Sequence, residues 1–383
     1  MKNYLLLIFA FTWLISCSGK EETSSSNNLL ENLSFSVDTV LVDAGDDFLN
    51  LSQGIFPNGL SPDRSKLYFF ENSPVQLVEI DLENLKLVKK TKFETEGPNG
   101  VGSYLSGLKI GPDQTLLVKS NNHVGLFDRN AQLLKNLRIS PTGIDSTLAD
   151  NYFALYSNSE FDFDSQKIYS YPSFRDASDN ILLIIDTQTK TARSLPVPKM
   201  KIVDEYSGTY TFESEQGTAI SFFSVRSSVS LLPKDLILST AALSGFYKLN
   251  LETETLEFVD IQHQIAAPEI QVVIPQDFSG PEEVRQLQNQ ILEQVNYQEI
   301  LWDESRQLYF RLGEKTFRGE SYEEPITYEY YLFVYDKDFK VVGESKLEGI
   351  DFKLKNLFFK DGKLWSYVNV EDELGFAVLT FDF

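Results

Sequence analysis

The sequence repeats a short unit six times, and this repetition restricts the fold more than any other feature. Each copy is a polar turn followed by an apolar strand. The six copies are Ser65–Phe69, Gln114–Val118, Gln166–Ser170, Lys234–Leu238, Arg306–Phe310 and Gly362–Ser366. A second apolar strand then runs into an Asp or Asn, whose side chain caps a turn and tolerates left-handed backbone. These corners are Asp81, Asp128, Asp186, Asn250, Asp336 and Asp382.

Each repeat holds about four short antiparallel strands, and a four-stranded sheet repeated radially is a propeller blade. We therefore predict an all-β fold, a six-bladed β-propeller over residues 31–383. The sixth repeat reaches Phe383 after only three strands. Residues 33–42 alternate apolar and polar side chains ahead of the first repeat. We predict that this strand completes the last blade and closes the ring, with one face buried, because closure removes an open sheet edge.

Two segments interrupt the repeats. Residues 281–295 start with a proline and two glutamates, which suits a helix N-terminus. Four apolar residues follow at helical spacing: Val284, Leu287, Ile291 and Val295. We predict one amphipathic helix between the fourth and fifth blades, packed on its own propeller. Residues 199–219 are polar and contain glycine, so we predict a loop between the third and fourth blades.

The first 16 residues have the features of a secretory signal peptide. Lys2 stands near the start, an apolar run extends from Tyr4 to Ile15, and the small Ser16 precedes a cysteine. A transmembrane anchor would need roughly 20 apolar residues, and the polar stretch from Ser18 begins too early for one. We expect residues 1–16 to be removed on export.

The stretch Leu14 to Cys17 resembles the lipobox of bacterial lipoproteins, whose cysteine is acylated and becomes the new N-terminus. Cys17 is the only cysteine in the sequence, so it has no disulfide partner and would be a liability as a free thiol after export. The resemblance implies a lipid on Cys17 that attaches the protein to a membrane. Residues 17–30 read as a flexible tether. Ser18–Glu22 is either a solvated linker or an acidic signal resembling the one that takes Bacteroidota lipoproteins to the outer face of the outer membrane.

Charge limits the choice of partners. The formal net charge is −22 at pH 7, which favours solubility and repels phosphate backbones. No block of Lys and Arg with interleaved aromatic residues is present, so nucleic acid is not an expected partner. The same charge opposes docking on anionic lipid. A protein or a glycan remains as a candidate partner.

Motifs for catalysis or cofactor binding are absent from the sequence. Two histidines, His123 and His263, and one cysteine make a His/Cys metal site unexpected. The glycines of residues 97–102 lack the dinucleotide spacing, and no Gly-x-Ser-x-Gly elbow occurs. We expect no metal and no cofactor. Carboxylates are plentiful, and a pair of them would suit glycoside hydrolysis, although each is also typical of a solvated turn.

Ligands of propellers usually lie over the central channel, near the loops at one end of the innermost strands. Arg226 follows the apolar run Phe222–Val225, which we assign to the inner strand of the fourth blade. Asn121 and His123 belong to the hairpin after the second strand of the second blade. We take these three residues as candidate binding residues, each of which also has a structural or solvated interpretation.

The lipobox, the joint Glu96–Gly100, the inserted helix and the segment Tyr297–Asp303 after it together resemble six-bladed propeller lipoproteins of Bacteroidota. The group in question is known as domain of unknown function 4221, and the resemblance covers residues 31–383. It implies a fold and a cell-envelope location, and no catalytic residues. We therefore expect a membrane-anchored binding or scaffold module. The alternative is a hydrolase or lyase that acts on a glycan or lactone in the channel, because the fold supports both.

Overall fold

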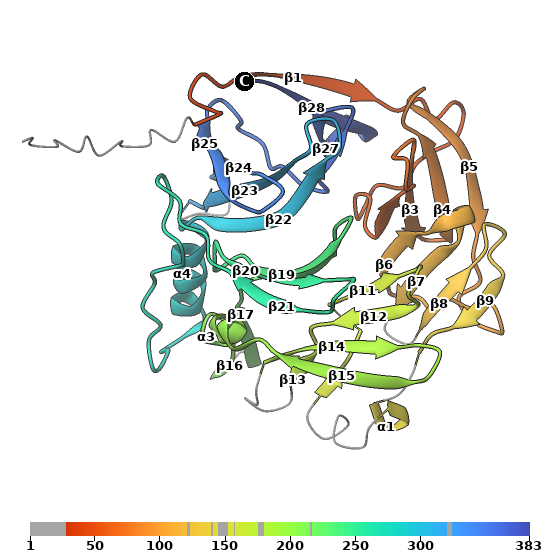
Figure 1. Cartoon of the computed structure of the whole chain (residues 1–383), viewed down its shortest axis with the longest axis horizontal. Helices are drawn as coiled ribbons and strands as arrows, with labels where there is room; N and C mark the ends of the chain where they lie inside the picture. The colour runs from red at the N-terminus through yellow and green to blue at the C-terminus, as the bar shows by residue number, and fades with distance from the viewer. Residues whose placement is uncertain are drawn as a thin grey trace, which may run out of the picture.

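The computed structural model describes residues 28–120, 123–138, 141–144, 152–156, 158–174, 180–214, 217–319 and 324–383. Six four-stranded antiparallel sheets are arranged around a common centre (Figure 1). The predicted all-β, six-bladed propeller is confirmed. The signal peptide, Cys17 and the tether up to residue 27 lie outside the described residues.

The blades follow one another in chain order. The first three blades are β2 (Asn58–Leu60), β3 (Lys66–Asn72), β4 (Val75–Asp81) and β5 (Lys86–Lys92), then β6 (Leu105–Ile110), β7 (Leu116–Ser120), β8 (Val124–Phe127) and β9 (Leu133–Asn136), then β11 (Ser159–Asp162), β12 (Lys167–Ser170), β14 (Ile181–Asp186) and β15 (Thr191–Pro196). The last three are β18 (Ser227–Leu231), β19 (Asp235–Thr240), β20 (Phe246–Asn250) and β21 (Leu256–Val259), then β22 (Asn296–Asp303), β23 (Leu308–Phe317), β24 (Thr327–Tyr335) and β25 (Val341–Leu347), then β26 (Phe358–Lys360), β27 (Lys363–Val370), β28 (Glu373–Asp382) and β1 (Ser34–Leu41).

The ring closes through β1, as predicted. This strand pairs antiparallel with β28 over its whole length, from Ser34 opposite Asp382 to Leu41 opposite Gly375. Figure 1 shows β1, at the start of the colour scale, beside β28 at its end. The expected buried face is only half formed, because β1 is the outermost strand of the sixth blade. Phe35 is partly buried, whereas the Val37 side chain remains 39% exposed.

Contacts with the propeller begin earlier than the sequence indicates. Asn28 accepts a hydrogen bond from the backbone N–H of Glu344 (2.9 Å), and the N–H of Leu29 donates to the Val342 carbonyl (2.9 Å). Leu30 is 2% exposed and packs between the fifth and sixth blades. Residues 28–30, assigned to the tether from sequence, therefore belong to the folded domain.

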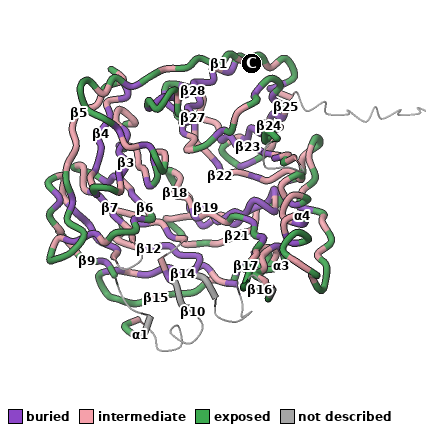
Figure 2. Tube along the Cα trace, turned by 180° about the vertical axis from the view of Figure 1, so that it is seen from behind, coloured by how far each residue is buried: buried purple, intermediate pink, exposed green. Residues whose placement is uncertain are grey.

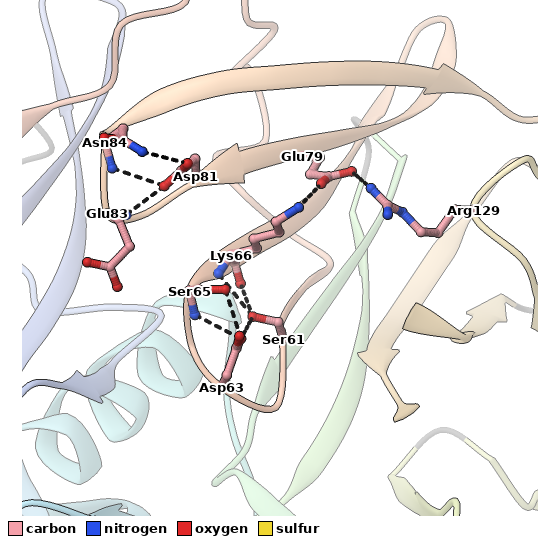
Figure 3. Close-up of polar contacts among 9 residues, drawn as sticks. All are labelled: Ser61, Asp63, Ser65, Lys66, Glu79, Asp81, Glu83, Asn84 and Arg129. Carbon is pink, nitrogen blue, oxygen red and sulfur yellow. Dashed lines mark hydrogen bonds and ion pairs between the residues drawn. The ribbon is translucent and has the colours of Figure 1, made fainter. Parts of the chain in front are cut away.

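The repeated acidic turns have a common geometry, which Figure 3 shows for the first blade. Asp63 accepts hydrogen bonds from the Ser61 hydroxyl (2.6 Å) and the Ser65 backbone N–H (3.1 Å). At the next corner, Asp81 accepts the N–H groups of Glu83 (2.8 Å) and Asn84 (3.0 Å). The corners of later blades repeat this second pattern: Asp128, Asp186, Asn250 and Asp336.

The core is divided into wedges between neighbouring blades. In β3, Leu67 and Phe69 pack against the sixth blade, while Tyr68 and Phe70, on the opposite face, pack against the second. Burial is concentrated on the middle strands of each blade, and outer strands such as β5 and β15 contain no buried residue (Figure 2). Both faces of a middle strand are thus removed from water, as in a strand sandwiched between two layers.

Short pieces outside the blades complete the described chain. They are η1 (Pro112–Gln114), α1 (Pro141–Ile144), β10 (Tyr152–Ala154), β13 (Ser173–Phe174), η2 (Pro198–Met200), α3 (Lys201–Glu205), β16 (Gly208–Ser214), β17 (Gly217–Phe223) and α4 (Pro281–Leu292). The predicted helix is confirmed as α4, although it ends at Leu292 rather than at Val295. Its buried residues are Val284, Leu287 and Ile291.

The prediction of a loop over residues 199–219 is wrong. This segment forms α3, β16 and part of β17, and β16 pairs with β17 as a hairpin beside α4 (Figure 1). The run ending at Val225 is likewise not the inner strand of the fourth blade. Phe223 belongs to β17 and packs with Phe278 and the helix, and the inner strand is β18. The apolar run indicated a strand correctly, but its apolar face covers α4 instead of a neighbouring blade.

Candidate functional site

The innermost strands of all six blades enclose a central channel with a volume of about 670 Å³. The strands that contribute are β2, β6, β11, β18, β22 and the approach to β26. This volume lies in the range of roughly 300–1,000 Å³ that is common for small-molecule sites. Unlike such sites, which are mostly apolar, the channel is lined mainly by charged, hydroxyl and amide side chains.

Positive charge predominates in this lining. Five cationic side chains contribute to it: Lys109, Lys119, Arg226, Lys353 and Lys355. Only two acidic side chains do so, Glu160 and Glu299. The protein as a whole carries a net charge of −22. The channel is therefore a local cationic region inside a strongly acidic molecule, and a concave site of one sign concentrates ions of the opposite sign.

Lys119 reaches the channel from β7, the second strand of its blade. It passes over Gly107 of β6, where an added Cβ would lie 2.3 Å from the Lys119 Cε atom. Its ammonium donates to the Ser159 carbonyl at 2.6 Å. Burial lowers the pKa of Lys119, with the charge of Glu160 acting in the opposite direction. No carboxylate pairs with Lys119 in the described part of the chain, because Glu160 pairs with Lys109.

Arg226 stands at the start of β18 and belongs to a chain of polar contacts. Its guanidinium donates to the Gln298 side-chain oxygen at 2.9 Å, and the Gln298 amide donates to Glu314 at 3.1 Å. Lys353 lies 3.7 Å from the other oxygen of Glu314. The fully buried Arg311 donates to the Gln298 carbonyl at 2.7 Å and holds this strand in place.

Lys355 and Gly54 lie beside the same aromatic ring, that of Tyr367. The Lys355 ammonium is 5.1 Å from the centre of the Tyr367 ring. Gly54 approaches that ring from the first blade, where an added Cβ would be 3.1 Å from the Tyr367 Cε1 atom. Two residues later, Phe56 lines the channel with its side chain 51% exposed. An exposed phenyl ring and an ammonium without a described carboxylate partner thus line the same channel.

Glu299 is the acidic group most affected by the channel. Its side chain is open to the lumen, although the ring of blades encloses it on all sides. This enclosure raises the pKa of Glu299, and the negative charge of Glu160 raises it further, while Arg226 opposes the shift. A carboxyl group with a raised pKa takes up a proton more readily and then donates a hydrogen bond.

The structure brings one of the sequence-predicted binding residues to the channel. Arg226 belongs to the lining, whereas His123 lies in the β7–β8 hairpin outside it, and Asn121 lies outside the described residues. Sequence reasoning missed the lysines, Glu299 and Phe56. The alternation of side chains along an inner strand shows that Glu299 lies on one side of that strand. It does not show that this side faces the central channel.

Histidine and metal chemistry have little basis at this site. No histidine is among the described residues that line the channel, and His263 is buried between the fourth and fifth blades, stacked 3.8 Å from the Phe333 ring. Burial lowers the pKa of His263 to about 3. In the described ranges, no group of three or more His, Cys, Asp and Glu residues is placed to hold a metal ion.

None of the described helices is long and apolar enough to cross a membrane.

Comparison with known proteins agrees with this architecture. The family model described as domain of unknown function (DUF4221) matches residues 28–346. The chain belongs to this family. A crystal structure of a DUF4221 member from Bacteroides vulgatus is 16% identical, with a TM-score of 0.65, and the match covers 93% of this chain and 99% of that one.

A second solved structure is more distant. A putative exported protein from Bacteroides fragilis is 11% identical, with a TM-score of 0.48 over 93% of this chain and 96% of its own. No functionally curated protein matches the sequence. At 16% identity the likeness to the solved DUF4221 structure concerns the fold alone, so function has to be argued from the channel.

Proposed function

We propose that this propeller is a lipid-anchored binding module whose central channel holds a soluble anionic ligand. The observation that carries the proposal is the cationic lining inside an acidic protein. Lys119, Arg226 and Lys355 form no close ion pair with a carboxylate among the described residues, although the chain has an excess of acids. A bound anion would supply the missing partner in an enclosed site, where salt screens the interaction less than at the surface.

Titration calorimetry with citrate in metal-free buffer tests the proposal, because citrate is a small polyanion. The mature protein should bind it, and Lys119→Gln, Arg226→Gln and Lys355→Gln should each weaken binding by roughly tenfold, equivalent to about 1.4 kcal/mol. Lys337→Gln is the matched control, since Lys337 is an exposed lysine in the β24–β25 turn, outside the lining.

Thermal unfolding of each variant checks that the fold is intact. Absence of citrate binding, or equal weakening by Lys337→Gln and the channel variants, would contradict a binding site in the channel. Lys355→Gln and Arg226→Gln carry most weight here, because both residues are exposed and contribute little to the core.

A hydrolase or lyase is the second candidate, because Glu299 lines the channel together with Glu160 and Arg226, and its enclosure there raises its pKa. Such an acid is suited to proton transfer. Incubation with an acidic or neutral oligosaccharide, followed by measurement of new reducing ends and of unsaturated product, tests this candidate. Turnover that is lost in Glu299→Gln would favour the enzyme over the binding module.

The anchor is the second part of the proposal and is supported by the sole cysteine placed at the lipobox. Cys17→Ala should abolish incorporation of labelled fatty acid and release the protein or leave it unprocessed. Cys17→Ser is a second variant that keeps the size of the side chain and should behave in the same way. Equal labelling of variant and parent would contradict lipidation.

The location follows from the same segment. We propose an outer-membrane lipoprotein of the cell envelope that is directed to the cell surface by Ser18–Glu22. Protease added to intact cells should then remove the protein, and replacement of Lys20, Glu21 and Glu22 by Ala should protect it. Protection of the parent protein in intact cells would place it on the inner side.

A further inference from the structure

We infer that the ligand of the channel is an acidic sugar, either a free uronic acid or an oligosaccharide that contains one. This inference rests on the proposed function and narrows it to one class of anion. Three features of the channel carry it: cations that form no ion pair in the described chain, an exposed aromatic ring in the same lining, and polar side chains that make no side-chain hydrogen bond in the described chain.

The cations account for a carboxylate. Arg226 precedes the inner strand of the fourth blade and Lys355 precedes that of the sixth, and both are exposed residues of the channel lining. A guanidinium binds a carboxylate through two parallel hydrogen bonds, and an ammonium adds a point charge. Any small carboxylate would satisfy this feature, so the charge alone does not identify a sugar.

The exposed ring separates a sugar from a simple carboxylate. Phe56 is 51% exposed and lines the same channel as Lys355, two residues after the Gly54 that packs on Tyr367. The electron-rich face of a phenyl ring attracts the weakly positive C–H groups on one face of a pyranose. An aliphatic carboxylate such as citrate offers no comparable flat face. Burial of this ring by a ligand would also remove apolar surface from water.

The uncommitted polar side chains account for hydroxyl groups. Asn58, Ser106 and Asn356 line the channel and make no side-chain hydrogen bond within the described residues. They come from the first, second and sixth blades, close to Phe56 in the order of the ring. These side chains are at least partly exposed, so the hydroxyl groups of a sugar can replace the water that hydrates them. The volume of about 670 Å³ leaves room for more than one sugar ring.

Calorimetry with four probes tests the inference on the mature protein. The probes are trigalacturonate, monomeric galacturonate, neutral maltotriose and citrate. We expect trigalacturonate to bind at least tenfold more tightly than citrate and maltotriose. Comparison with the monomer distinguishes an oligosaccharide from a free uronic acid as the ligand.

Variants of the ring assign the effect to Phe56. Phe56→Ala should weaken uronate binding by at least tenfold and leave citrate binding unchanged, and Phe56→Tyr, which keeps a ring, should retain uronate binding. Phe48→Ala is the matched control, because Phe48 is 76% exposed but lies outside the channel. Lys355→Gln should weaken the binding of both uronate and citrate.

The outcomes separate this inference from the proposed function. If citrate binds as tightly as the uronates and Phe56→Ala changes neither, the acidic-sugar inference fails while anion binding in the channel stands. If maltotriose binds as tightly as trigalacturonate, the role of the cations is wrong. If no anion binds, both proposals fail.

Discussion

At the scale of single residues, the charge of the channel depends on which charged side chains reach its lumen. Lys119 starts on a second strand and reaches the lumen only because Gly107 opposite it has no side chain. Glu299 starts on an inner strand and faces the lumen directly. The sequence contains no signal for the first of these, because the opening over a glycine is created by the pairing of two strands. To predict that Glu299 faces the lumen, one would need to know how β22 is placed in the ring.

The raised pKa of Glu299 predicts a pH dependence of ligand binding. As the pH falls through this raised pKa, Glu299 becomes neutral and one negative charge leaves a lumen that also contains Glu160 and the cations Arg226, Lys353 and Lys355. Affinity for citrate should therefore rise as the pH is lowered from neutral towards the pKa of Glu299. Citrate binding measured across this range checks the direction.

Glu299→Gln is the variant that assigns this effect. It should bind citrate more tightly than the parent at neutral pH and show a flatter pH dependence. A variant with the same slope as the parent would mean that another group, or the titration of citrate itself, causes the change. Repetition with a sulfonate probe, which stays charged across the range, removes the second cause.

At the scale of elements, the repeated turns determine the strand boundaries. The Asp336 carboxylate accepts the N–H groups of Asp338 and Lys340, both at 2.9 Å. The Asp338 side chain in the same turn accepts no hydrogen bond from the described residues. The pair therefore isolates the contribution of the capping carboxylate from that of an exposed acid.

Asp336→Ala should lower the free energy of unfolding by about 1 kcal/mol, because the two backbone donors lose their acceptor. Asp338→Ala should change it by less than about 0.5 kcal/mol, as is usual for surface positions. Denaturant unfolding of the two variants measures both values. Equal effects of the two substitutions would contradict a special role for the corner residue.

These turns also explain which elements could be predicted from the sequence. Local chemistry marks the capped corners of the first five blades. The sixth repeat was readable from its polar turn and strand, although Asp382 ends β28 and caps no turn. The hairpin β16–β17 was not, because its apolar face, including Phe223, is covered by α4. That helix lies some sixty residues further along the chain, and only the folded molecule brings the two together. Strand β1 was found because its partner blade lacked a strand.

At the scale of the whole molecule, the ring is held closed by the pairing of β1 with β28 across nearly the whole chain. Deletion of residues up to 43 should expose the edge of β28 together with apolar surface between the fifth and sixth blades. We expect a lower unfolding temperature and aggregation, measured by scanning calorimetry and light scattering.

Deletion up to residue 27 is the matched control, and it should alter neither quantity. Deletion up to 31 should have an intermediate effect, because it removes the buried Leu30 and the hydrogen bonds of Asn28 but leaves β1 in place. Equal stability of all three truncated proteins would show that the β1 pairing does not hold the ring closed.

The channel is the other property of the whole molecule, since every blade contributes to it and no single repeat contains it. The most direct measurement is a crystal structure of the mature protein grown with trigalacturonate. We predict ligand density in the central channel, with a carboxylate within hydrogen-bonding distance of Lys355 or Arg226 and a sugar ring on Phe56. Density only on the outer surface, or an empty channel at a saturating ligand concentration, would contradict the proposal that this propeller binds an anionic ligand at its centre.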